Sequence, residues 1–326
     1  MTNRNSITFT SLLGDIIRHF LTYAKDTELV QSRHEDLERF RSLAPRFQNV
    51  YSNFAQNDCS PFLVDAWKRF NDDFVAMCDP SLPENFLHHP IVLHTLTGNP
   101  VRPLWKPFLA EIFQMLGETN SAPLLKETLI GNPRICEKEF LTSPGRITHL
   151  WMLASYIDYL SSQGKSQQSL DTIIEFGGGF GGLAHVWSQL GQRRPTYVIF
   201  DSPIMCAIQW QYLSALNGED LVTPIFDSKQ PLVSGTINLL PVSMLSRRDL
   251  SGDVFVSTWA LSESNDLAQQ AVIDANWFSA PHILLAFQRS SQSFPLAERF
   301  KSMAAERGGL LKEMPYYFAN NFSYFV

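Results

Sequence analysis

The stretch TIIEFGGGFGGLAHVW, residues 172–187, constrains the fold of this chain more than any other. It runs from a short apolar segment through a carboxylate, Glu175, into five glycines within six positions, which only Phe180 interrupts. Glycine tolerates the positive φ angles of a tight turn and lets a ligand approach the backbone closely. The apolar residues that follow have helical spacing, and a helix N-terminus presents free N–H groups. The pattern predicts a strand, a glycine turn and a helix that together bind a nucleotide.

Downstream of Asp171 the sequence alternates between segments typical of strands and of helices. Strands with apolar centres are expected where helices cover both faces of a parallel sheet. The last two apolar runs are too close together for a parallel crossover, so they predict an antiparallel hairpin. We expect strands at residues 172–176, 196–200, 236–240, 254–258 and 282–287, crossover helices at 203–216 and 267–278, and a hairpin that joins 310–317 to 322–326.

The part of the chain before the glycine stretch has mostly helical periodicity. Pro45 is expected to break or kink one of these helices. We place the domain boundary just ahead of Arg146: residues 1–145 form a helical region that supplies an acceptor pocket, a lid or an oligomer interface, and residues 146–326 bind the nucleotide. The expected helices are residues 12–23, 34–55, 61–77, 103–117 and 146–160.

Composition narrows the class of protein. Hydrophobic residues make up 44% of the chain and charged residues 18%, which is typical of a globular protein. The net charge of −6 argues against a nucleic-acid partner, because no basic excess neutralises phosphates. An N-terminal apolar stretch is interrupted by Asp15, Arg18 and His19, so no membrane span is expected. The four scattered cysteines predict reduced thiols, no metal site and a cytoplasmic location.

The glycine run fits two nucleotide-binding patterns. Residues 177–182 contain the G-x-G-x-x-G fingerprint of dinucleotide-binding folds, in which an acid such as Asp201 holds a ribose. Glu175 and the alternate glycines after it also give E-x-G-x-G-x-G, the loop of S-adenosylmethionine (SAM)-dependent methyltransferases. A carboxylate there repels a pyrophosphate but favours the ammonium and sulfonium of SAM. The carboxylate and the hairpin therefore favour a methyltransferase over a nicotinamide-dependent oxidoreductase.

Three segments carry a resemblance to a known family. IIEFGGGFGGLAHVW, YVIFDSPIMCAIQWQYL and VFVSTWALSESN together resemble the bacterial sugar O-methyltransferases, over about residues 140–326. The resemblance implies a Rossmann-like class I methyltransferase fold, SAM as cofactor, and methylation of a sugar hydroxyl on a glycan or glycosylated metabolite. Phe176, Phe180 and the Ser-Thr-Trp after the fourth strand depart from the family pattern, which puts the acceptor in doubt more than the cofactor.

In an open α/β sheet the ligand lies beyond the carboxyl ends of the strands, at the switch point beside the first strand. We expect the glycine loop to lie against the methionine part of SAM, with the amides of residues 181–183 near its carboxylate. Asp201 is expected to hold the ribose diol, although it also suits a helix N-cap. The expected cofactor contacts are Glu175, Gly177, Gly178, Gly179 and Gly181 in the loop, Asp201 and Ser202 after the second strand, Val242 and Ser243 near adenine, and Thr258 at the end of the fourth strand.

Methyl transfer to a hydroxyl needs a group that removes its proton. Glu263, just beyond the fourth expected strand, is the first candidate base, with a helix-cap role as the alternative. His149 is a second catalytic candidate, and Arg146, one turn earlier, shares its helix face.

Two further residues are expected to bind the acceptor in addition to Arg146. Trp259 is placed to stack on a sugar face or to pack in the core, and His88 belongs to a local histidine group that contacts the acceptor if the N-terminal region forms a lid. The alternatives left open are a non-sugar acceptor, an NAD-binding oxidoreductase, and a non-catalytic partner protein with the same fold. A homo-oligomer through the N-terminal helices is also compatible with the sequence.

Overall fold

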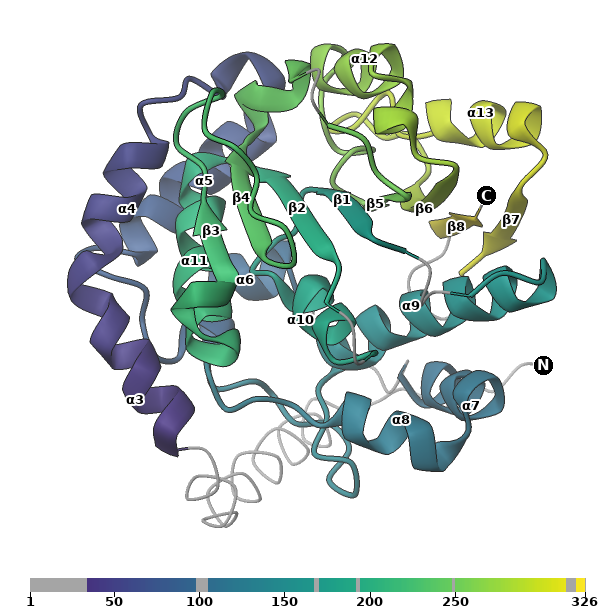
Figure 1. The fold of residues 1–326 in the computed structure, drawn as a ribbon, viewed down its shortest axis with the longest axis horizontal. Helices are drawn as coiled ribbons and strands as arrows, with labels where there is room; N and C mark the ends of the chain where they lie inside the picture. The colour runs from purple at the N-terminus through teal and green to yellow at the C-terminus, as the bar shows by residue number, and fades with distance from the viewer. Residues whose placement is uncertain are drawn as a thin grey trace, which may run out of the picture.

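The computed structural model of the 326-residue chain describes residues 34–97, 105–166, 170–191, 194–247, 250–314 and 321–325. Its centre is an eight-stranded sheet with the order β3-β4-β2-β1-β5-β6-β8-β7 (Figure 1). The strands are β1 (Thr172–Phe176), β2 (Thr196–Asp201), β3 (Val222–Pro224), β4 (Ile237–Pro241), β5 (Val254–Thr258), β6 (His282–Gln288), β7 (Leu310–Glu313) and β8 (Asn321–Phe325).

The sheet is Rossmann-like and ends in the C-terminal antiparallel pair that the sequence predicts. Neighbouring strands from β3 to β6 pair in parallel, whereas β8 is antiparallel to both β6 and β7 and lies between them. The five predicted parallel strands and the C-terminal antiparallel pair are confirmed, with bounds shifted by a residue or a few. Strand β3 was not predicted, because it has three residues and only its first is buried.

Helices cover both faces of the sheet and bury alternate residues of each strand. Ile173 of β1 faces a core that includes α9 (Pro144–Ser162), α10 (Gly182–Ser188) and α11 (Pro203–Asn217), and the next residue, Ile174, faces the other core. That second core lies under α12 (Asp266–Asp274), and α13 (Arg299–Arg307) follows on the same side in Figure 1. Between these two layers of helices, the carboxyl ends of the parallel strands all lie at one edge of the sheet.

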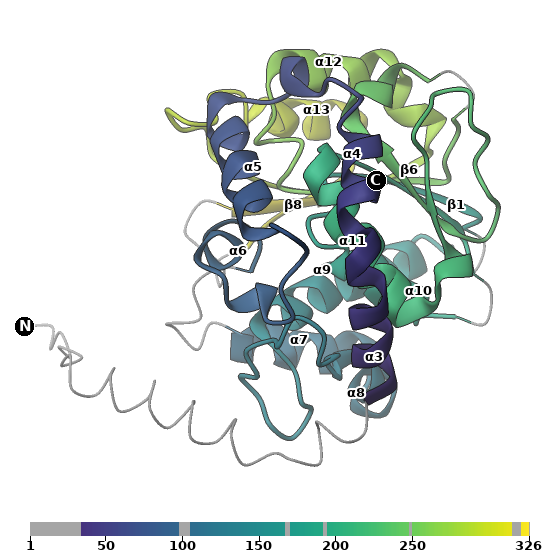
Figure 2. The same ribbon diagram turned by 90° about the vertical axis from the view of Figure 1, so that its left-hand side faces the viewer.

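The N-terminal helices pack on the sheet domain through α11 and α9. Figure 2 shows α3 (His34–Leu43) and α4 (Phe47–Phe54) lying along α11, with the short helix Ala44–Arg46 at the predicted Pro45 break. Farther on come α5 (Asp65–Met77), α6 (Pro90–Thr95), α7 (Trp105–Leu116), which packs on α9, and α8 (Glu118–Leu125). One apolar core continues from Phe40 and Phe47 to Leu213 of α11, across the boundary placed at residue 146.

The helix predicted for residues 12–23 lies outside the described residues. Helices α6 and α8 were not predicted, because each is short and is interrupted or preceded by proline or glycine. Among the helices that the structure describes, none combines the length and the apolar character that a bilayer crossing demands.

Candidate functional site

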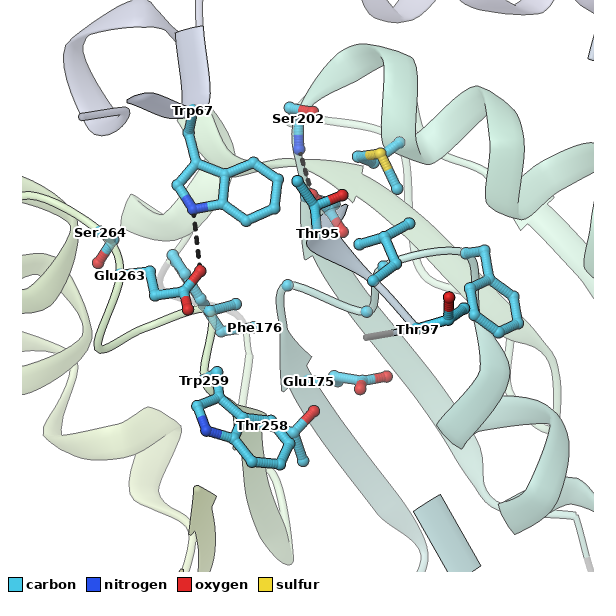
Figure 3. A pocket seen from close by; sticks show the side chains of 18 of the residues that line it. Trp67, Thr95, Thr97, Glu175, Phe176, Ser202, Thr258, Trp259, Glu263 and Ser264 are labelled. Carbon is cyan, nitrogen blue, oxygen red and sulfur yellow. Dashed lines mark hydrogen bonds between the residues drawn. The ribbon is translucent and has the colours of Figure 1, made fainter. Parts of the chain in front are cut away.

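A cavity of about 920 Å³ lies at the carboxyl edge of the sheet, within the size range of small-molecule sites. The ends of β4, β2, β1, β5 and β6 line it from the sheet side, because parallel strands all end at the same edge. The N-terminal region lines the opposite side (Figure 3). Lining residues from 146–326 include His149 of α9, Glu175–Phe180 of the loop, Asp201, Ser202, Val242, Thr258, Trp259, Glu263 and Gln288, and N-terminal ones include Phe62, Leu63, Trp67, Asn71, Leu93, His94, Thr97 and Arg134.

The glycine loop between β1 and α10 needs glycine for both conformation and space. Gly177 has φ +75°, and a Cβ there would lie 2.0 Å from the Cβ of Ala260. A Cβ on Gly178 would lie 2.7 Å from Cγ2 of Ile199. Neither clash is relieved by rotating a flexible side-chain end, so only glycine fits these two positions. Gly177, Gly178 and Gly179 line the cavity and form a cradle in which a ligand can contact the backbone.

Glu175 is buried beneath this loop, with 1% of its surface exposed. The hydroxyl of Tyr197 on β2 donates to its Oε2 at 2.9 Å. Burial raises the pKa of Glu175 to about 8, although the Tyr197 bond favours the ionised form. A cation bound in the cavity would lower that pKa and hold the carboxylate ionised, which is the electrostatic complement of a positively charged ligand.

We expect the stability of the ligand-free protein to fall with rising pH because of Glu175. Its folded pKa of about 8 exceeds the value of about 4.3 in an unfolded chain, so between these values the folded state binds the extra proton. The stabilising contribution is complete below about pH 4 and is lost as pH rises through 8. From pH 5.5 to 8.5, the free energy of unfolding of wild type should fall relative to Glu175→Gln by roughly 3 kcal/mol.

Urea unfolding at pH 5.5, 7 and 8.5 measures this difference. The exposed Glu139→Gln is the matched control and should follow wild type at all three pH values. If the free energies of unfolding of wild type and Glu175→Gln changed equally with pH, the raised pKa of Glu175 would be contradicted.

Asp201 ends β2 and belongs to a hydrogen-bonded unit with Gln209. The backbone N–H of Ser202 donates to Oδ1 at 2.8 Å, and Nε2 of Gln209 donates to Oδ2 at 2.8 Å. Gln209 also donates to the carbonyl of Gly179 at 2.8 Å, so it ties the glycine loop to the end of β2. Burial raises the pKa of Asp201 to about 7, against the lowering effect of these bonds. The N-cap of α11 is Ser202, so Asp201 is not that cap.

The residues after β4 are only partly brought to the cavity. Val242 lines it, whereas Ser243 does not and instead lies with its Oγ 3.7 Å from Sγ of Cys59. Ser202 lines the cavity, and its hydroxyl donates to Oδ1 of Asn71 on α5 at 3.0 Å. The N-terminal region is therefore bonded to the sheet beside Asp201.

Glu263 lies at the other end of the cavity, in the segment after β5. Nε1 of Trp67 on α5 donates to its Oε2 at 3.2 Å, as Figure 3 shows, and Nε2 of Gln288 donates to Oε1 at 3.1 Å. Burial raises its pKa to about 7, and both donors oppose this shift. A carboxylate with such a pKa suits a general base near neutral pH. The cap of α12 is Asn265, so Glu263 does not serve as that cap.

Thr258, Trp259 and His149 also line the cavity. Trp259 has φ +68°, and its indole N–H donates to Oδ1 of Asn321 at 2.7 Å, which fixes the ring at the cavity wall. His149 packs against the glycine loop, since a Cβ on Gly182 would lie 2.6 Å from its Cε1. Burial and the nearby charge of Arg146 lower the pKa of His149 to about 4, so the imidazole is neutral at pH 7.

Three residues expected at the site lie outside the cavity lining in addition to Ser243. Arg146 is buried, and its guanidinium donates to the carbonyl of Leu124 at 2.7 Å and to Oε1 of Gln189. Of the predicted Arg146–His149 pair, only the histidine therefore faces the cavity. His88 is likewise absent from the lining, where His94 takes its place, because the turn of α6 directs the later histidine inward.

The third is Gly181, and its position corrects the expected contact for a ligand carboxylate. Its backbone N–H donates to the carbonyl of Gly178 at 2.9 Å, and neither Gly181 nor the next two residues line the cavity. The cavity lining therefore offers no support for a contact of these amides with a ligand carboxylate.

Four lining or supporting residues were missed by sequence reasoning: Trp67, Gln209, Gln288 and Arg134. Gln209 had a signal, since it is a polar residue within the apolar helix IMCAIQWQYL and is fully buried. The other three reach the site only through tertiary packing. Within the described ranges, no group of three or more histidine, cysteine, aspartate or glutamate side chains is arranged to hold a metal ion.

Comparison with protein-family models and with curated proteins finds no match for this chain. Among solved structures, magnesium protoporphyrin IX methyltransferase from Synechocystis PCC 6803 with bound SAM is 13% identical over 70% of this chain and 99% of its own, with a TM-score of 0.38. Human N-acetylserotonin methyltransferase in complex with SAM is 12% identical over 72% and 68%, with a TM-score of 0.34. Mitomycin 7-O-methyltransferase is 11% identical over 75% and 73%, with a TM-score of 0.37. Because these similarities are distant, the function has to be inferred from this chain's own residues.

Proposed function

We propose that this protein is a SAM-dependent O-methyltransferase. The observation that carries the proposal is a row of carboxylates along one cavity, in the order of the strands: Asp201 at β2, Glu175 at β1 and Glu263 after β5. Glu175 and Asp201 flank the uncovered backbone of the glycine loop, where a nucleoside fits. Glu263 lies beyond them, where a second ligand fits.

The charges of this row favour SAM over NAD. The ammonium and sulfonium of SAM would lower the raised pKa values of the two carboxylates beside the glycine loop and be attracted by their ionised forms, whereas a pyrophosphate gains nothing from either carboxylate. When bound, the cofactor supplies an electrophilic methyl group on sulfur. The loop backbone would lie along its methionine part, Asp201 would accept hydrogen bonds from the ribose hydroxyls, and Val242 would contact adenine. The strand pair β7–β8 also belongs to the methyltransferase sheet.

The chain's own residues then have two tasks in the transfer. They would orient the acceptor hydroxyl toward the methyl group that the bound cofactor supplies. Glu263 would accept the proton that this hydroxyl loses as its oxygen takes the methyl group, with the sulfur of the cofactor as the leaving group. Trp67 and Gln288 hold the carboxylate in place for this step and favour its ionised form. His149, neutral at pH 7, is the second candidate for the proton-accepting group.

The proposed acceptor is an uncharged compound that carries a hydroxyl group. More specifically, we propose a sugar hydroxyl. The wall around Glu263 is formed largely by aromatic and apolar side chains, including Phe62, Leu63, Trp67 and Trp259, and indole rings can pack on the apolar face of a sugar. The same wall suits a non-sugar small molecule. Mass spectrometry of extracts from a deletion strain, compared with its parent, distinguishes these by the compound that loses one methyl group.

The remaining sequence predictions stand as parts of this proposal. Residues 1–145 act as the acceptor-binding region, because Trp67 and Asn71 of α5 contact both ends of the cavity. Assembly through the N-terminal helices and a cytoplasmic location stay predictions.

Titration calorimetry with S-adenosylhomocysteine and NAD in parallel tests the cofactor. We expect S-adenosylhomocysteine to bind with a dissociation constant in the micromolar range and NAD to show no heat above dilution. Binding of NAD alone would point to the oxidoreductase, and binding of neither would point to a non-catalytic partner protein. Adenosine serves as the control for nucleoside recognition common to both.

A further inference from the structure

Arg134 lies in the loop between α8 and α9 and lines the cavity. Within the described part of the chain, its guanidinium has no hydrogen bond and no ion pair, and it is the one arginine or lysine among the described lining residues. Burial without a compensating anion lowers its pKa, yet an arginine stays charged at neutral pH. A half-buried cation with free donors in a ligand cavity favours an anionic ligand.

The loop that carries Arg134 is held in place on both sides. The carbonyl of Gly131 accepts from the backbone N–H of Leu87 at 3.1 Å, and the N–H of Cys136 donates to the carbonyl of Thr142 at 2.9 Å. The backbone on both sides of Arg134 is therefore held beside the cavity.

Its neighbours place Arg134 at the glycine-loop end of the cavity. Arg134 and Phe180, the residue inside the glycine run, line the same small crevice beside the main cavity, together with Gly145 at the start of α9. Glu127 also lines this crevice, but its carboxylate accepts from Ser143 and from the N–H of Thr128 and makes no ion pair with Arg134. Glu263 and the acceptor wall lie at the other end, after β5 and β6.

We propose that Arg134 binds the carboxylate of the methionine part of SAM. The amides of residues 181–183, which the sequence suggested for this carboxylate, do not line the cavity, so the anionic end of the cofactor lacks a partner there. A guanidinium presents paired N–H groups that match a carboxylate in a bidentate geometry. With Glu175 and Asp201 on the cationic and ribose parts, Arg134 completes a charge-matched site. The inference rests on the proposed cofactor.

Calorimetry with SAM and with decarboxylated SAM isolates this contact, because the two ligands differ only in the carboxylate. For Arg134→Gln we expect SAM to bind about 10- to 100-fold more weakly and decarboxylated SAM to bind within about twofold of wild type. Arg134→Lys should recover part of the loss, since it keeps the charge without the fork. Arg69→Gln, an exposed arginine outside the cavity, is the matched control and should bind both ligands as wild type does.

The outcomes separate the two proposals. Unchanged SAM affinity in Arg134→Gln overturns the carboxylate contact while the methyltransferase proposal stands. If Arg134→Gln binds SAM and decarboxylated SAM equally more weakly, the carboxylate contact is also overturned, because Arg134 would then stabilise the pocket without contacting the carboxylate. If wild type binds neither ligand, the cofactor proposal itself fails, and circular dichroism of each variant shows whether a loss reflects unfolding.

Discussion

Glu263→Gln is expected to lower the methyl-transfer rate by a factor of about 10²–10⁴, the usual worth of a positioned base. Glutamine keeps the size of the side chain but cannot take the proton from the acceptor hydroxyl. The measurement is transfer of label from S-adenosyl-[methyl-³H]methionine to the small-molecule extract of a strain that lacks this protein. The affinity for S-adenosylhomocysteine should change less than about twofold, because Glu263 lies at the acceptor end of the cavity.

The pH profile provides the second readout for Glu263. With its pKa raised to about 7, the ionised fraction grows with pH, so the rate should rise tenfold per pH unit below 7 and level off above it. Trp67→Phe removes a hydrogen bond that favours the ionised form, so the rise should move to higher pH. Glu139→Gln, exposed and outside the cavity, serves as control. Full activity of Glu263→Gln would exclude it as the base and favour His149.

Asp201→Asn is expected to weaken SAM binding by about 10- to 100-fold. The carboxylate can accept charge-assisted hydrogen bonds from both ribose hydroxyls, each worth about 1.5–3 kcal/mol, and an amide replaces one acceptor oxygen by a donor. The new amide group would also face Nε2 of Gln209, which now donates to Oδ2. Titration calorimetry of the purified variant measures the change.

The ligand pair used for Arg134 sharpens the Asp201 experiment. SAM and decarboxylated SAM share the ribose, so Asp201→Asn should weaken both by the same factor. The exposed Asp274→Asn is the matched control. An unchanged affinity would leave Asp201 with the purely structural task of holding the N–H of Ser202.

Local sequence patterns predicted the elements that build the site. The strand, glycine turn and helix of residues 172–188 follow from side-chain periodicity and from positive φ angles, both of which are properties of neighbouring residues. Glu175, Asp201 and Glu263 could be assigned to one edge because parallel strands end on the same side of a sheet. The sequence left open whether Asp201 and Glu263 cap helices. The structure shows that Ser202 and Asn265 are instead the N-caps of α11 and α12.

Side-chain direction was the weaker part of the prediction. Arg146 and His149 share a helix face by spacing, but the long arginine side chain turns back to Leu124 and Gln189 in the interior of the protein. The sequence analysis singled out His88, which lies in the short helix Phe86–His88, whereas His94 lies on α6, whose rotation about its axis depends on what it packs against. Only the second of the two reaches the cavity.

The sequence by itself therefore determined the sheet, the glycine cradle and the row of carboxylates, since each depends on local periodicity or on the shared edge of parallel strands. Only the tertiary structure decided which other groups meet them. Trp67 lies 196 residues from Glu263 in sequence, and Arg134 reaches the glycine loop from a separate segment. Contacts between such distant segments arise from the packing of the N-terminal helices on α9 and α11, which no local pattern encodes.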